Sequence, residues 1–184
     1  MKMDPRVKTT ADGLALEFQK QQVLAEMMTK NTEAVTTARA LREQVQKLIG
    51  KTPGTPGDNS ATQSKLPGPL ADAVSAFGKK LSGILGGGGF GVQASPSPTL
   101  SRASGAIAGL YSELDRSDAA PTAAQLAAID ATEKDSSAVL KLWQEFQATD
   151  LPALNRQLKS AGFAELQPAS KSPVSGADDD GDIE

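Results

Sequence analysis

The stretch from Thr10 to Gly50 constrains the fold most, because it is long and contains no proline. Its apolar side chains recur at steps of three and four residues, which is the spacing of one buried face on an α-helix. At 1.5 Å per residue this helix would be roughly 60 Å long, and an isolated helix needs partners along its side. The predicted face consists of Leu14, Phe18, Leu24, Met28, Val35, Ala38, Leu41, Val45 and Leu48.

Three further stretches have helical periodicity and supply such partners. The first runs from about Pro69 to Leu85, with proline suited to the opening turn. The second begins after Thr99, a residue type that caps helices. The third runs from Thr122 to Gly162 and opens with the pattern of a capping box. Proline inside a helix breaks its hydrogen bonding, so we expect this last helix to restart or kink at Asp150 and Pro152.

The lengths of these stretches predict an all-α fold, an elongated antiparallel helical bundle in the order long, short, short, long. In that arrangement Pro152 faces the start of the first helix, and Phe163 and Leu166 fold back as an apolar plug. The helical domain would cover residues 10–166. Glycine and proline enrichment predicts flexible linkers at 51–68 and 86–98, and the acidic composition of 167–184 predicts a disordered tail.

Composition argues against several classes of function. The chain has no histidine and no cysteine, so the commonest general base and the commonest transition-metal ligands are missing. The net charge is −3, and lysine and arginine are scattered, without the basic footprint of a nucleic-acid-binding protein. There is no apolar run of the ~20 residues that span a bilayer. We therefore expect no cofactor, no metal, no nucleic-acid partner and no membrane partner.

Two groups of side chains are candidates for a site. Glu113, Asp115 and Asp118 resemble the paired carboxylates of glycoside hydrolysis, but nothing nearby in sequence would raise one pKa, so a solvated helix face is the better interpretation. Trp143 and Phe146 stand at helical spacing beside Leu140, which is compatible with a core, a ligand platform or a docking surface. The possible docking surface comprises Leu14, Phe18, Trp143, Phe146 and Phe163.

Parts of the chain resemble a known family. The segment LYSELDRSDAAPTAAQ (Leu110–Gln125), then Trp143, then DLPALNRQLKSAGF (Asp150–Phe163) are similar to the C-terminal region of large bacterial sortilin-like proteins. Those proteins contain BNR (Asp-box) β-propeller repeats and are often labelled glycosyl hydrolases. The opening KMDPRVK (Lys2–Lys8) resembles the last strand of the small immunoglobulin-like domain that precedes their helical region, so residues 1–9 are expected to be a remnant strand.

The resemblance implies a role without catalysis in this chain. No position corresponds to a propeller residue, so no catalytic residue is carried over. The leading expectation is a C-terminal helical structural module, a fragment of a larger exported protein, that docks in cis on an upstream propeller or immunoglobulin-like domain. Its compartment would then be periplasmic or extracellular. The alternatives are a self-standing helical adaptor or oligomerisation protein, and a glycoside-hydrolase-related activity that resides in the parent propeller.

Overall fold

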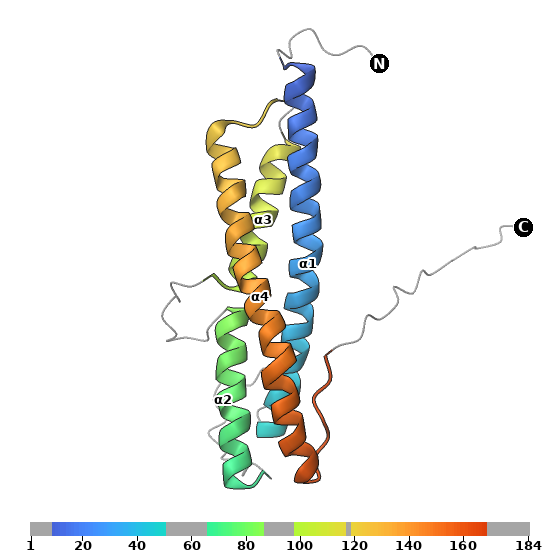
Figure 1. Ribbon diagram of the computed structural model, residues 1–184, viewed down its shortest axis with the longest axis vertical. Coiled ribbons are helices and arrows are strands. Elements are labelled where there is room, and N and C mark those ends of the chain that lie inside the picture. The colour runs from blue at the N-terminus through green and yellow to red at the C-terminus, as the bar shows by residue number, and fades with distance from the viewer. Residues whose placement is uncertain (1–8, 51–65, 87–97, 117–118, 169–184) are drawn as a thin grey trace, which may run out of the picture.

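The computed structural model describes four helices, and the predicted all-α, elongated bundle is confirmed (Figure 1). They are α1 (Ala11–Ile49), α2 (Gly68–Leu85), α3 (Leu100–Asp115) and α4 (Ala123–Ser160). The structure describes residues 9–50, 66–86, 98–116 and 119–168. The predicted strand at 1–9, the linkers at 51–68 and 86–98 and the tail at 167–184 lie largely outside the described residues.

Local side-chain chemistry sets the ends of the two long helices. The Thr10 hydroxyl oxygen accepts a hydrogen bond from the Gly13 N–H at 3.1 Å, which caps the start of α1. Gly50 ends that helix in the left-handed conformation with φ 78°, which glycine adopts at little cost. At the start of α4, the Thr122 and Gln125 side chains each bond the backbone N–H of the other, as the predicted capping box requires.

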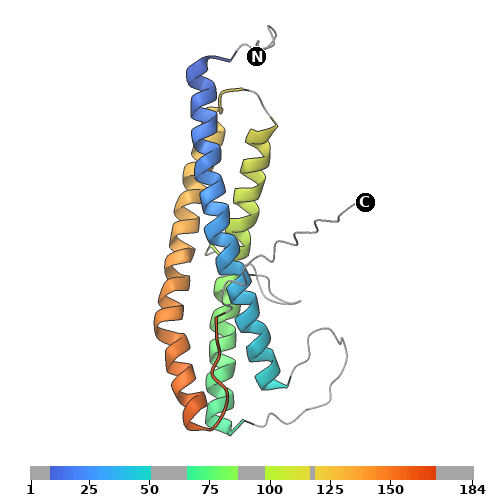
Figure 2. The same ribbon diagram turned by 90° about the vertical axis from the view of Figure 1, so that its right-hand side faces the viewer.

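The two short helices lie end to end and form one leg of the bundle. Both run opposite to α1 and α4 (Figures 1 and 2). With 18 and 16 residues, α2 and α3 together span about 51 Å, close to the roughly 58 Å of the 39-residue α1. The bundle therefore has three legs, and the middle leg is an interrupted helix.

The middle leg is interrupted between the end of α2 and the start of α3, where Gly86 lies close to Thr99. Gly86 follows α2 with φ 73° and ψ 157°, a conformation that is almost restricted to glycine. A Cβ placed on Gly86 would lie 2.6 Å from the Thr99 Cβ, and the Ser101 hydroxyl donates to the Gly86 carbonyl at 3.4 Å. The chain thus leaves the middle leg at Gly86 and returns to it at Thr99, which lies next to Gly86.

Helices α1 and α4 run in the same direction, which corrects one sequence prediction. Going down α1, Lys20 pairs with Asp130, and Asn31 bonds Ser136. Because α2 and α3 share one leg, the chain reverses direction only twice. Pro152 follows Ser136 by sixteen residues on α4 and therefore lies towards the end of α1, so its predicted position opposite the start of α1 is wrong.

The predicted restart at Asp150 and Pro152 is also wrong, because α4 continues through the proline to Ser160. Pro152 removes the N–H that would bond the carbonyl of Ala148, and both residues lie on the exposed face. Water can bond the freed carbonyl there, while the opposite face keeps its burial. That buried face is formed by Leu151, Leu154 and Leu158.

A polar layer divides the core into two clusters. Asn31 is fully buried, and its Nδ2 donates to the Ser136 Oγ at 2.6 Å and to the Met27 carbonyl at 2.9 Å. Thr132, one turn before Ser136, is buried as well. The upper cluster comprises Leu24, Met27, Ile107, Leu114 and Ile129. The lower, larger cluster joins α2 to the second halves of α1 and α4 and includes Leu41, Val74, Phe77, Leu81, Phe146 and Leu158.

The Asn31–Ser136 pair is expected to cost stability when only one member is removed. Asn31→Ala leaves the Ser136 hydroxyl buried without its partner and should lower the free energy of unfolding by about 1 kcal/mol. The double variant Asn31→Leu with Ser136→Ala replaces both partners by apolar groups, so its stability should equal or exceed that of the wild type. Urea unfolding followed by circular dichroism measures both. A double variant that is less stable than Asn31→Ala would contradict this account.

Candidate functional site

The five residues predicted as a docking surface do not share one surface. Leu14 is half-buried and Phe18 is 61% exposed, both near the start of α1. Trp143 and Phe146 are 4% and 1% exposed, so these two contribute to the core. Phe163 is half-buried against the lower cluster at the other end of the bundle.

Trp143 and Phe146 belong to an aromatic group that joins α2 to α4. The ring centroids of Phe77 and Phe146 are 4.6 Å apart with planes at 36°, and those of Trp143 and Phe146 are 5.8 Å apart at 19°. Both separations are those of favourable aromatic pairs. The Lys80 ammonium contacts the Asp150 carboxylate at 2.6 and 2.8 Å, close in sequence to the same rings. This part of the molecule therefore holds α2 to α4.

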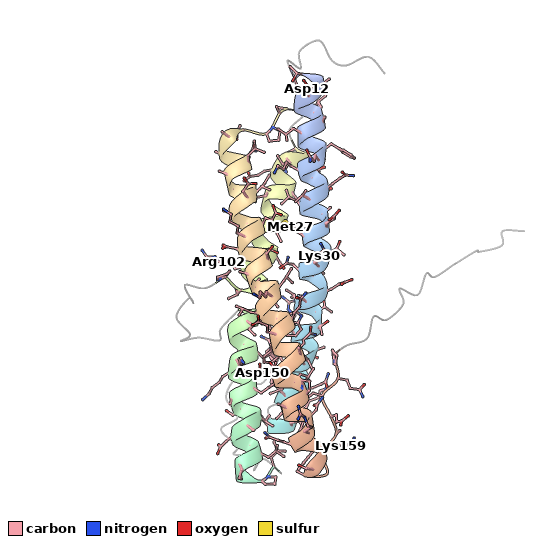
Figure 3. All side chains as sticks on the ribbon, viewed as in Figure 1. Asp12, Met27, Lys30, Arg102, Asp150 and Lys159 are labelled. Carbon is pink, nitrogen blue, oxygen red and sulfur yellow. The ribbon has the colours of Figure 1, made fainter. Side chains whose placement is uncertain are left out.

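The start of α1 presents one face to the bundle and another to solvent. Figure 3 places Asp12 at the extreme end of the bundle, beyond the tips of α3 and α4. Gly13 is buried, and a Cβ built on it would lie 2.8 Å from the Cβ of Ala120, in the connection before α4. Phe18 follows five residues later and so points about 140° away around the helix. Its ring faces away from that contact.

Phe18 belongs to an uncharged stripe on the solvent side of α1. We define the α1 outer stripe as the exposed residues Ala11, Ala15, Phe18, Gln22, Ala25 and Thr29. They follow one another at steps of four and three residues and so line a single face. The Thr29 hydroxyl donates to the carbonyl of Ala25 at 3.1 Å, which satisfies its donor inside the helix. The stripe therefore offers a ring, methyl groups and one amide, with no charge.

Leu142, which stands beside Trp143 in the sequence, is a second large apolar side chain that is exposed in the described residues. Leu142 is 46% exposed on α4. Spacing alone gave no signal of this exposure, because Leu142 lies three residues after Val139 and four before Phe146, the same steps as the buried stripe. The nearby rings of Trp143 and Phe146 are buried, and the residues Lys141 and Gln144 are exposed and polar. Leu142 serves below as a matched control for Phe18.

The carboxylate candidates lie in an open setting. Glu113 and Asp115 are exposed near the end of α3, and Asp118 is outside the described residues. The described part of the chain contains no group of three acidic side chains placed to hold a metal ion. A depression between α3 and α4 has a volume of about 40 Å³ and is lined by Arg102 and Thr132, among others. That volume suits a water molecule or two and is far below the roughly 300 Å³ of a small-molecule site.

None of the helices in the described ranges combines the length and the apolar character needed to cross a bilayer. Comparison of the chain with models of protein families, with curated proteins and with solved structures finds no match.

Proposed function

We propose that the chain is a non-catalytic helical structural module that docks in cis on an upstream propeller or immunoglobulin-like domain. The observation that carries the proposal is the exposure of Phe18, which is 61% exposed in the middle of the uncharged α1 outer stripe. Fully burying a phenylalanine stabilises an interface by about 1.5–3 kcal/mol, and aromatic anchors dominate interface energetics.

The position of the stripe supports the same partner. The stripe begins beside Asp12, which Figure 3 places at the extreme end of the bundle. A domain that precedes α1 would therefore meet Phe18 and the half-buried Leu14 before the rest of the helix. An uncharged stripe fits an apolar patch and does not complement a charged surface. The resemblance of Lys2–Lys8 to a strand of an immunoglobulin-like domain suggests that the partner is a β domain of this kind. Under this proposal the parent protein is exported, and the module lies in the periplasm or outside the cell.

Phe18→Asp is the variant that tests this role. With the upstream β domain supplied as a separate protein, we expect the wild-type chain to bind it and Phe18→Asp to bind at least about tenfold more weakly, because a charge would be buried against apolar surface. Isothermal titration calorimetry measures both affinities. Leu142→Asp introduces the same charge at the other large apolar side chain that the described residues expose, and it should leave binding unchanged.

Two results would contradict the proposal. One is an upstream DNA sequence without a reading frame for a propeller or an immunoglobulin-like domain. The other is a chain that forms a stable symmetric dimer which Phe18→Asp dissociates, since the stripe would then be an interface between two copies. Light scattering on dilution measures the second.

A further inference from the structure

The chain after α4 turns back along the bundle as an ordered segment. Gly162 adopts φ 78°, its N–H donates to the carbonyl of Lys159 at 3.1 Å, and the Phe163 N–H donates to that of Leu158 at 2.9 Å. This is the hydrogen bonding of a Schellman motif. Figure 2 shows the following residues running back beside the helices. We call residues 163–168 the return segment.

Two primary amides hold the backbone of the return segment. Asn155 on α4 donates from Nδ2 to the Leu166 carbonyl at 2.8 Å, and its Oδ1 accepts from the Leu166 N–H at 2.8 Å. Gln44 on α1 donates from Nε2 to the Gln167 carbonyl at 2.8 Å, and its Oε1 accepts from the Gln167 N–H at 3.1 Å. Each amide therefore satisfies both backbone groups of one residue.

The hydrogen bonds from these two amides require an extended backbone in the bound segment. In an extended strand, the N–H and C=O of one residue point to one edge, and those of the next residue point to the opposite edge. Asn155 bonds one edge and Gln44 bonds the other, so amides from two helices flank the segment as neighbouring strands would in a sheet. We call Gln44, Asn155 and the buried position that Leu166 fills the amide cradle.

Only one side chain of the return segment is deeply anchored. Leu166 is 3% exposed and joins the lower core cluster, whereas Ala164, Glu165 and Gln167 are exposed. The ion pair between Lys159 and Glu165, at 3.6 Å, joins two exposed groups and contributes little. Recognition thus consists of main-chain hydrogen bonds and one leucine, which is the chemistry by which proteins bind short peptides in trans.

We propose that the amide cradle is a recognition site for an extended peptide of another polypeptide with leucine at the position of Leu166, and that the return segment is its resident occupant. A peptide with the same backbone and one leucine makes the same contacts. The cradle lies at the opposite end of α1 from Phe18, so this site does not depend on the docking proposed above.

The host for the test is the full chain carrying Leu166→Asp, which disfavours seating of its own return segment. The probe is a fluorescein-labelled peptide with the sequence of residues 162–168, titrated by fluorescence anisotropy. We expect the wild type to bind it about a hundredfold more weakly than the Leu166→Asp host, because a tethered segment competes at a millimolar effective concentration. Adding Asn155→Ala to the host should weaken binding at least tenfold. Adding Gln157→Ala, an exposed residue on the same turn of α4, should not.

Absence of binding to a folded Leu166→Asp host would overturn the proposal. Equal binding of a peptide whose leucine is replaced by aspartate would overturn it as well. If circular dichroism shows that the host does not fold, hydrogen exchange of the wild type tests the proposal instead. At millimolar peptide, the amides of Leu166 and Gln167 should exchange faster while those in mid-α4 do not change. Unchanged protection of these two amides would show that the segment is only a permanent cover.

Discussion

Phe146→Ala should lower the free energy of unfolding by about 3–5 kcal/mol, the range for removing a buried aromatic ring. Phe146 is 1% exposed, stacks on Trp143 and contacts Phe77 in a tilted arrangement, so the truncation leaves a cavity between α2 and α4 that neither ring can fill without moving. Urea unfolding at constant temperature measures the change. Because α2 and α4 meet at this ring, we expect the whole unfolding transition of the chain to shift to lower urea concentration.

The matched control is Phe18→Ala, the same chemical change at an exposed ring. Its effect on stability should stay within about 0.5 kcal/mol, since truncation at the surface removes few contacts. Comparable losses in the two variants would contradict the assignment of Phe146 to the core and Phe18 to the surface. Comparison of the two variants therefore distinguishes an aromatic ring that stabilises the core from one that is available to bind a partner.

Gly86→Ala should destabilise the chain by about 2–3 kcal/mol. The backbone of Gly86, with φ 73° and ψ 157°, is strained for any residue with a Cβ, and the new methyl group would collide with the Thr99 side chain. Relief requires α2 and α3 to move apart, which disrupts the end-to-end arrangement of the middle leg. Thermal unfolding followed at 222 nm measures the loss.

Gly83→Ala is the control on the same helix. A Cβ there meets no atom within 4 Å, and alanine favours the helix by up to about 1 kcal/mol over glycine. We therefore expect a stabilised chain. If Gly86→Ala were as stable as Gly83→Ala, the close approach of α2 to α3 would not exist in solution.

Much of the helical content could be predicted from sequence because its determinants are local. Thr99 and Thr122 accept hydrogen bonds from the first turns that follow them, as their positions indicated, and Thr10 does the same for α1. The apolar stripe of α1 is buried at five predicted positions, Leu24, Val35, Ala38, Leu41 and Val45, and half-buried at Leu14, Met28 and Leu48. Phe18 is the exception. It lies six residues before Leu24, about 120° away around the helix, and thus outside the buried arc.

The direction of the legs could not be predicted, because it depends on a non-local contact. A glycine-rich connection permits α3 to fold back beside α2 or to continue its line. The close approach of Gly86 to Thr99 favours the second arrangement, in which α3 continues the line of α2. Nothing in the sequence around Gly86 or Thr99 predicts this contact.

The candidate sites show the same limit. Trp143 and Phe146 have a spacing compatible with core or surface, and only the packing of Phe77 from another helix resolves it. Gln44 and Asn155 look like ordinary polar helix residues. Gln44 meets its backbone partner 123 positions later, beyond the reach of any local pattern.

The most direct test of the proposed docking role is photo-crosslinking in the longer polypeptide that the proposal requires, in which a β domain precedes this chain. Benzoyl-phenylalanine replaces Phe18 in one sample and Leu142 in a matched one, and mass spectrometry locates the crosslinked peptides after irradiation. The account predicts crosslinks from position 18 to the upstream domain and none to that domain from position 142. Crosslinks to it from position 142 alone, or from position 18 only to a second copy of the chain, would contradict it.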